Sequence, residues 1–266
     1  MNLIAAQNAA VKAARAAGKI MRQHWLKPKR VKLADLHDIK LELDVRCQKT
    51  IEKILRAAFP GCAILGEEGI SGDIQADDRW VVDPIDGTVN YFFGMPHAAV
   101  SIALQARNPR RRAGEEDYLT QVGVIFDPFT DELWTVRRGG PTRLNGRVVR
   151  VSDRSRVNDA LVAMGFSKTR ENLEKSLPYL NRLARQAKKV RIMGSAALEL
   201  AYVASGRLDI YIERRINLWD IAAGGLMVEC AGGDFYAVPV KGQFRYAMAA
   251  DNGRLRRRLN LGRLLE

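Results

Sequence analysis

The chain has 266 residues, 47% of them hydrophobic, and a formal net charge of +13 at pH 7. This length can bury a substantial core in one or two domains. No apolar run approaches the roughly 20 residues that span a bilayer, and the N-terminus lacks a long apolar signal core, so we expect a cytoplasmic protein without a membrane anchor. The charge favours anionic partners such as phosphorylated substrates or nucleic acid, although charge alone is more typical of a solvated basic surface.

The cysteines and histidines argue against a disulfide framework and against a zinc site. The cysteines are odd in number and lack CxxC spacing, so we expect reduced, structural thiols at Cys47, Cys62 and Cys230. The histidines show no spacing of the HExxH type, which argues against a zinc site at His24, His37 and His97.

The N-terminal region predicts two helices. Residues 2–25 are rich in alanine, with larger apolar residues at near-helical spacing, and Gly18 marks a place of close packing. The following segment, up to residue 43, is polar and is expected to be irregular. A second helix opens at Asp44, for which the default role is an N-cap worth ~1 kcal/mol, and stops at residues 59–61.

Two short apolar runs then end in acids. Residues 63–65 lead into the turn GEEG, and residues 80–82 lead into DPIDGT. Pro84 fixes its own φ and favours a turn, so Asp83 and Asp86 can face one point, which would suit a hard cation such as Mg²⁺. Gly87 permits a positive φ or a close backbone approach. An ordinary Asx turn is the alternative explanation.

The rest of the chain predicts strands and then an alternating pattern. Strands are expected at 98–104, 121–126 and 132–136, with a hairpin loop at 127–131 and an exposed, mobile tip at 107–117. Beyond residue 146 the segments alternate. In order they are a strand at 160–165, a helix at 171–187, a strand at 189–193, a helix at 195–205, a strand at 208–213, a helix capped by Asp220, an apolar segment at 235–240 and a short helix at 253–266. We therefore expect an N-terminal α+β half, 1–140, and a C-terminal α/β half, 141–266.

The three acidic motifs occur in a specific order. GEE, then WVVDPIDGT, then WD before a helix of small residues resembles the inositol monophosphatase family, over residues 9–252. Members of that family are magnesium-dependent, lithium-sensitive phosphatases. The resemblance implies an α+β fold, a layered α-β-α-β-α sandwich of the sugar-phosphatase type with an antiparallel-rich N-terminal sheet. It also implies a homodimer.

The resemblance assigns roles to the acids. Glu67, Asp83 and the carbonyl of Ile85 would bind one Mg²⁺, and Asp83, Asp86 and Asp220 a second. Glu68 is a neighbouring acid behind these ligands. Thr88, hydrogen-bonded to Asp44, would orient and deprotonate the attacking water, and the amides of Gly87 and Thr88 would cradle the phosphate.

Substrate recognition is expected in the second half, together with Asp86 and Asp220. Free amides in the segment Gly194, Ser195 and Ala196 could meet a substrate hydroxyl or phosphate; an ordinary strand–helix junction capped by Ser195 is the alternative. The family places a polyol-binding glutamate at the position of Glu213, which could otherwise be a surface acid paired with Arg214 or Arg215.

Two departures from the family pattern affect what is implied. Residues 38–43, DIKLEL, replace an Asp-x-Val-Thr-type segment, and Lys32 is the nearest candidate for the loop lysine, so a third metal and lithium sensitivity stay open. Val89 replaces a second threonine.

The reaction that the resemblance implies is hydrolysis of inositol monophosphate. The alternatives are a fructose 1,6-bisphosphate or 3′-phosphonucleotide phosphatase, or a family member that binds RNA or the transcription apparatus.

Overall fold

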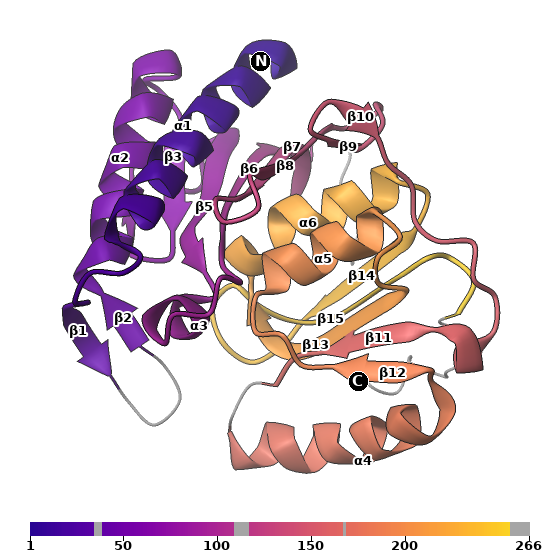
Figure 1. Ribbon diagram of the computed structural model, residues 1–266. Coiled ribbons are helices and arrows are strands. Elements are labelled where there is room, and N and C mark those ends of the chain that lie inside the picture. The colour runs from indigo at the N-terminus through magenta and orange to yellow at the C-terminus, as the bar shows by residue number, and fades with distance from the viewer. Residues whose placement is uncertain (35–38, 109–116, 167–168, 256–266) are drawn as a thin grey trace.

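The computed structural model describes residues 1–34, 39–108, 117–166 and 169–255. These residues form five layers, in which a helix pair, a sheet, a second helix pair, a second sheet and one outer helix are stacked in that order (Figure 1). The predicted α-β-α-β-α sandwich is therefore confirmed.

The first layer consists of α1 (Leu3–His24) and α2 (Glu42–Ala58). The side chain of Asn2 caps α1 by accepting the amides of Ile4 and Ala5 at 3.0 and 3.1 Å. Gly18 faces the sheet so closely that a Cβ there would lie 2.5 Å from the ring of Phe126. The predicted first helix and its close-packing glycine are both confirmed.

The start of α2 corrects one prediction. The helix begins at Glu42, so Asp44 is its third residue rather than the N-cap, and the Asp44 carboxylate accepts the backbone amide of Leu41 at 2.6 Å. An acid at this position closes the first turn from inside the helix. From sequence it looks like a cap because both positions favour the same side chain.

The segment between α1 and α2 was predicted to be irregular, and this prediction is wrong in part. The segment contains a hairpin of β1 (Val31–Ala34) and β2 (Ile39–Leu41), whose antiparallel pairing is not visible in a polar composition. Asp38 and the side chain of Lys32, which carried the expectation of an atypical metal-binding loop, lie outside the described residues.

The first sheet has eight strands in the order β10-β9-β8-β7-β6-β5-β3-β4, antiparallel except for the parallel pair β3–β5. The strands are β3 (Ala63–Gly66), β4 (Gly69–Ser71), β5 (Asp78–Asp86), β6 (Ala99–Arg107), β7 (Tyr118–Asp127), β8 (Glu132–Arg137), β9 (Arg143–Leu144) and β10 (Arg147–Val148). The three strands predicted after the central motif are confirmed as β6, β7 and β8. The sheet continues past residue 140, and the domain division there stays a prediction.

Two loops of this sheet were also predicted. Asp127 accepts the amides of Phe129 and Thr130 at 2.8 and 3.3 Å, which closes the hairpin between β7 and β8. Of the predicted tip at 107–117, residues 109–116 lie outside the part of the chain that the structure describes.

Strand β5 is longer than predicted. It does not end at Val82 but continues to Asp86, and its register with β6 is irregular between Asp83 and Asp86. Pro84 lies within this irregular stretch and has no amide to donate to the ladder, which accounts for the break. Both aspartates are thus held on one buried strand.

The second half supplies the middle helices, the second sheet and the outer helix. The elements are α5 (Ala196–Ala204), α6 (Leu218–Cys230), β11 (Leu161–Met164), β12 (Lys189–Arg191), β13 (Ile210–Asn217), β14 (Asp234–Pro239), β15 (Arg245–Asp251), the 3₁₀ turn η1 (Val157–Asp159) and α4 (Arg170–Gln186). The sheet order is β12-β11-β13-β15-β14, with β11 parallel to both neighbours and the rest antiparallel. The predicted alternation is confirmed, but it missed β15, whose alanines lack strand propensity.

The buried core follows the layers. One apolar cluster joins α1 and α2 to the first sheet, a second surrounds α5 and α6 between the sheets, and a third lies under α4. Within the described ranges, no helix combines the length and apolarity needed to cross a membrane. The predicted C-terminal helix falls largely on residues 256–266, outside those ranges.

Candidate active site

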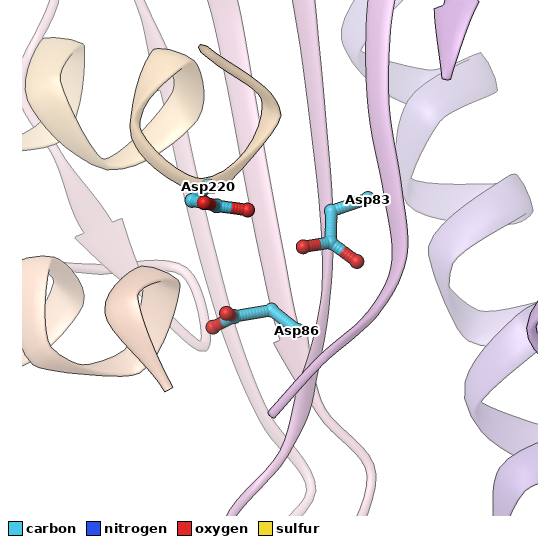
Figure 2. A group of neighbouring side chains, drawn as sticks. All are labelled: Asp83, Asp86 and Asp220. Atoms are coloured by element: carbon cyan, nitrogen blue, oxygen red, sulfur yellow. The ribbon is translucent and has the colours of Figure 1, made fainter. Parts of the chain in front are cut away.

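Three aspartates meet between the first sheet and the middle helices. Asp83 and Asp86 come from β5 and Asp220 from the first turn of α6, and each offers an oxygen within 4.8 Å of the others (Figure 2). Asp83 and Asp86 are only 1% and 7% exposed. The structure thus brings together acids that are more than a hundred residues apart in the chain.

Asp220 is not the cap that the sequence predicted. Asn217 occupies the N-cap position of α6, and Asp220 is the third residue of the helix, where its Oδ2 accepts the Asn217 amide at 3.0 Å. This is the same local arrangement as Asp44 in α2. The bond and the positive end of the helix fix the carboxylate beside β5.

The turn that carries Glu67 lies beside Asp83. The Glu67 amide donates to the carbonyl of Val82 at 3.1 Å, which places Glu67 next to the strand position of Asp83. Burial, followed by the charges of Glu67, Asp86 and Asp220, raises the pKa of Asp83 well above its usual range. Burial and the charge of Asp86 raise the pKa of Asp220 to about 8.

The raised pKa values of Asp83 and Asp220 bear on whether these acids fit a metal ion. Several buried carboxylates at close range cannot all be ionised without a compensating positive charge, so the metal-free cluster retains protons. Carboxylate oxygens are the ligands that hard divalent cations prefer, and binding would displace the protons. The donor set of Asp83, Asp86 and Asp220 therefore fits an ion such as Mg²⁺.

Asp86 also joins the two halves of the molecule. Its carboxylate accepts the Ser195 hydroxyl at 2.5 Å and the amides of Ala197 and Ala196 at 2.8 and 3.3 Å. Burial raises the pKa of Asp86 to about 6, although these three hydrogen bonds lower it by stabilising the ionised carboxylate. The expectation of free amides in the segment 194–196 is therefore wrong for Ala196. Ser195 lies at the N-cap position, yet its hydroxyl serves Asp86.

The residues after β5 form a tight entry to α3 (Thr88–Phe92). Gly87 has φ +88°, and a Cβ there would lie 2.9 Å from the His97 carbonyl, so both expectations for this glycine are confirmed. The Thr88 hydroxyl donates to the Ile85 carbonyl at 2.8 Å. Because the hydroxyl hydrogen of Thr88 is directed at Ile85, the hydrogen bond predicted between Thr88 and Asp44 stays a prediction.

Glu213 is positioned by groups that the sequence did not reveal. It accepts the hydroxyl of Tyr211, and its carboxylate fills the space that a Cβ at Gly165 would need. Burial raises the pKa of Glu213 to about 7. These contacts make Glu213 a half-buried acid bonded to a neighbour on its own strand, and its polyol-binding role stays a prediction.

Two further polar side chains hold the loop before α5. Glu199, only 1% exposed, accepts the Met193 amide at 3.1 Å. Asn90 of α3 donates to the carbonyls of Met193 and His97 at 2.8 and 2.9 Å. Sequence reasoning missed both, although an acid in the apolar run ALELA and an amide two residues after DGT were usable signals.

Fold and site together define the class of protein: a five-layered α+β sandwich with a buried cluster of carboxylates, suited to a divalent cation, between its sheets. The Inositol monophosphatase family matches residues 5–258. The chain belongs to this family, as its motifs indicated.

Individual relatives carry two kinds of name. The chain is 42% identical over 247 residues to "Nus factor SuhB" of Xylella fastidiosa, covering 89% of this chain and 82% of that protein. It is 42% identical over 197 residues to "Inositol-1-monophosphatase" of Rhizobium meliloti, covering 72% and 69%. The crystal structure of extragenic suppressor protein suhB from Bartonella henselae superposes with a TM-score of 0.86 at 34% identity, covering 98% of each chain.

Proposed function

We propose that the chain is a magnesium-dependent phosphomonoesterase that hydrolyses inositol monophosphate to inositol and phosphate. The observation that carries this proposal is the cluster of Asp83, Asp86 and Asp220, the first two buried and the third half-buried, with oxygens within 4.8 Å of one another. The resemblance to the Rhizobium meliloti inositol-1-monophosphatase supports the choice of substrate.

The ligands are assigned as follows. Glu67, Asp83 and the Ile85 carbonyl hold one Mg²⁺, and Asp83, Asp86 and Asp220 hold the second. When bound, Mg²⁺ neutralises the phosphoryl oxygens and lowers the pKa of the attacking water. Glu68 is the neighbouring acid on the same turn as Glu67.

Thr88 and Asp44 prepare the attacking water. Because the Thr88 hydroxyl donates its hydrogen to the Ile85 carbonyl, its lone pairs remain available to accept a hydrogen bond from water. This contact orients the water. To pass the proton on, the Thr88 hydroxyl would turn from the Ile85 carbonyl to the Asp44 carboxylate, donate its hydrogen there and take up the proton that the water loses. The role of Asp44 in α2 is compatible with its bond to the Leu41 amide, since a carboxylate has acceptor sites on two oxygens.

The substrate lies between the start of α3 and the loop before α5. The amides of Gly87 and Thr88 receive the phosphate, and the carboxylate of Glu213 accepts polyol hydroxyls. Gly194 presents its backbone at an exposed position with φ +81°. Ser195 and Ala196 act through Asp86, which they hold in place.

A phosphate-release panel tests the proposal. Purified protein is assayed with inositol monophosphate, fructose 1,6-bisphosphate and a 3′-phosphonucleotide, each with Mg²⁺ and with EDTA. We expect Mg²⁺-dependent release with the highest kcat/KM on inositol monophosphate, and inhibition by millimolar lithium. Preference for either other substrate would reassign the specificity, and release that persists in EDTA would remove the metal from the reaction.

A second function is favoured by a separate observation. Relatives carry the name "Nus factor SuhB", and the chain has a net charge of +13, with Lys189 and Arg191 exposed on the edge strand β12 and Lys188 exposed just before it. We propose that this surface associates with RNA or a transcription complex. Because phosphate contacts release counterions, the affinity for RNA should fall linearly with salt on a log–log plot, and Lys189→Glu should reduce the slope. An affinity that does not change with salt would contradict this function.

We also propose a homodimer in the cytoplasm. Exposed apolar side chains lie close to the site in sequence, at Phe93, Met95 and Ile192, and a second copy could cover them. Sedimentation at micromolar concentration measures the oligomeric state, and a monomer at all concentrations would contradict the dimer.

A further inference from the structure

A buried glutamine of α2 faces the turn that carries Glu67. Gln48 lies one helical turn after Asp44 and is 4% exposed. Polar side chains with so little exposure need hydrogen-bond partners inside the protein. Gln48 finds two of its three partners on the backbone of the GEE turn, residues 66–69.

Both polar atoms of the Gln48 side chain are hydrogen-bonded to these partners. Its Oε1 accepts the Glu68 amide at 2.9 Å, and its Nε2 donates to the Gly69 carbonyl at 3.1 Å and to Glu52 Oε1 at 3.0 Å. Since the carbonyl end and both hydrogens of the amide group are engaged, its orientation is determined. The backbone immediately after Glu67 is therefore tied to α2.

The backbone immediately before Glu67 is tied to the same side chain by packing. A Cβ at Gly66 would collide with the carbonyl and amide atoms of Gln48, so the turn lies directly on that group. On the opposite side the Glu67 amide donates to Val82 of β5 at 3.1 Å. The backbone of Glu67 is thus clamped between α2 and β5.

The turn has room to move if this contact is lost. A hollow of about 210 Å³ lies beside it, lined in part by Gln48, Lys49, Glu68 and Ser71. Packing alone does not hold the turn on that side, and the hydrogen bonds of Gln48 supply the restraint.

We propose that Gln48 is a positioning residue for the first metal site, whose side-chain amide holds the GEE turn so that Glu67 stands beside Asp83. This inference rests on the proposed assignment of Glu67 as a metal ligand. Partners that orient ligands from outside typically change metal affinity by about 10–100-fold when they are removed.

A matched pair of variants separates positioning from general stability. Gln48→Leu removes the three hydrogen bonds. Gln105→Leu makes the same change at a buried glutamine of β6, which is 5% exposed and accepts two bonds from Arg79 at 3.0 and 2.9 Å. Both variants lose buried hydrogen bonds and should melt at a lower temperature. Only the first should affect the turn.

Two measurements test the proposal. Hydrogen exchange on the metal-free proteins should show the Glu68 amide exchanging about tenfold or more faster in Gln48→Leu, and unchanged in Gln105→Leu. Calorimetric titration should show Mg²⁺ binding weakened about 10–100-fold in Gln48→Leu, with Gln105→Leu like the unchanged protein.

The outcomes distinguish this inference from the proposed function. If the Glu68 amide exchanges at the same rate in Gln48→Leu as in the unchanged protein, the clamp itself is overturned, whatever the Mg²⁺ affinity. Faster exchange with normal Mg²⁺ affinity, or an equal loss of affinity in both variants, overturns the role toward the metal. If the unchanged protein fails to bind Mg²⁺, the proposed metal site fails, and the role of Gln48 toward it is overturned with it.

Discussion

The two walls of the site are built in different ways. The wall proposed to bind the metal, called the metal wall below, takes Asp83 and Asp86 from a single buried strand, β5, so their separation is determined by three positions of backbone. The wall proposed to contact substrate, residues 193–196, is held by side-chain bonds instead: Asn90 of α3 donates to the Met193 carbonyl, and Glu199 of the following helix accepts the Met193 amide.

This difference indicates which properties can change separately. A strand position cannot move without disturbing the sheet, so the metal wall should tolerate little change. A loop held by two or three side-chain bonds can shift while the sheet stays intact, so we expect the proposed substrate wall to tolerate more change. Asp86 belongs to both walls, because its carboxylate also holds the start of α5.

The largest effect should follow from breaking the metal wall. Asp83→Asn removes the acid assigned to both ions and should reduce phosphate release to the level seen in EDTA, a loss of more than about 10⁴-fold. The fold should persist, because the variant relieves a crowded acidic cluster. Asp127→Asn, at an equally buried hairpin acid, is the control and should keep near-normal turnover. Normal turnover of Asp83→Asn at saturating Mg²⁺ would refute the metal assignment.

The next effect tests how the metal wall prepares water. Thr88→Val and Asp44→Asn should each lower kcat by about 10²–10⁴-fold, as expected for general-base assistance, with little change in Mg²⁺ affinity. The double variant should lose little more than either single one, because the residues act as a unit. If Asp44 only stabilises the start of α2, its variant would lose about 1 kcal/mol of stability and keep its turnover. Losses in kcat that multiply in the double variant would contradict a coupled pair.

Loosening the substrate wall should have a smaller and different effect. Asn90→Ala removes the bonds to the carbonyls of His97, Met193 and Gly194, at 2.9, 2.8 and 3.3 Å, and leaves these part-buried oxygens without that partner. We expect KM to rise by about tenfold, with Mg²⁺ affinity unchanged. Asn172→Ala, at a buried asparagine of α4, is the matched control. A fall in Mg²⁺ affinity in Asn90→Ala would show that the two walls are not separable.

The smallest effect concerns the stability of the metal-free protein. The pKa of Asp220 is raised to about 8, above the value of about 4 in an unfolded chain, so the carboxyl stays protonated in the fold at pH 5. As pH rises from 4 to 8, the fold must retain that proton or bury a charge, and stability is lost. In EDTA, Asp220→Asn should therefore raise the melting temperature more at pH 8 than at pH 5, by about 2–4 °C for each kcal/mol relieved. An equal shift at both pH values would contradict the raised pKa.

Local patterns in the sequence predicted much of this structure. Helix α1 and the strands around the central motif follow from apolar periodicity and from turn residues such as Gly87, which act within a few positions. The order of the acidic motifs can be read directly from the sequence. The errors were also local in origin. Asp44 and Asp220 were each taken as helix caps, because an acid inside the first turn and an acid at the cap satisfy similar amides.

The assembly of the site depended on tertiary structure. Asp86 binds Ser195 across 109 positions, and Gln48 meets the backbone around Glu67 only because α2 packs against the first sheet. The sequence by itself determined which acids the protein carries and the family to which it belongs. Docking of the layers decided which amides, hydroxyls and carboxylates face one another, because such contacts join segments that share no local pattern.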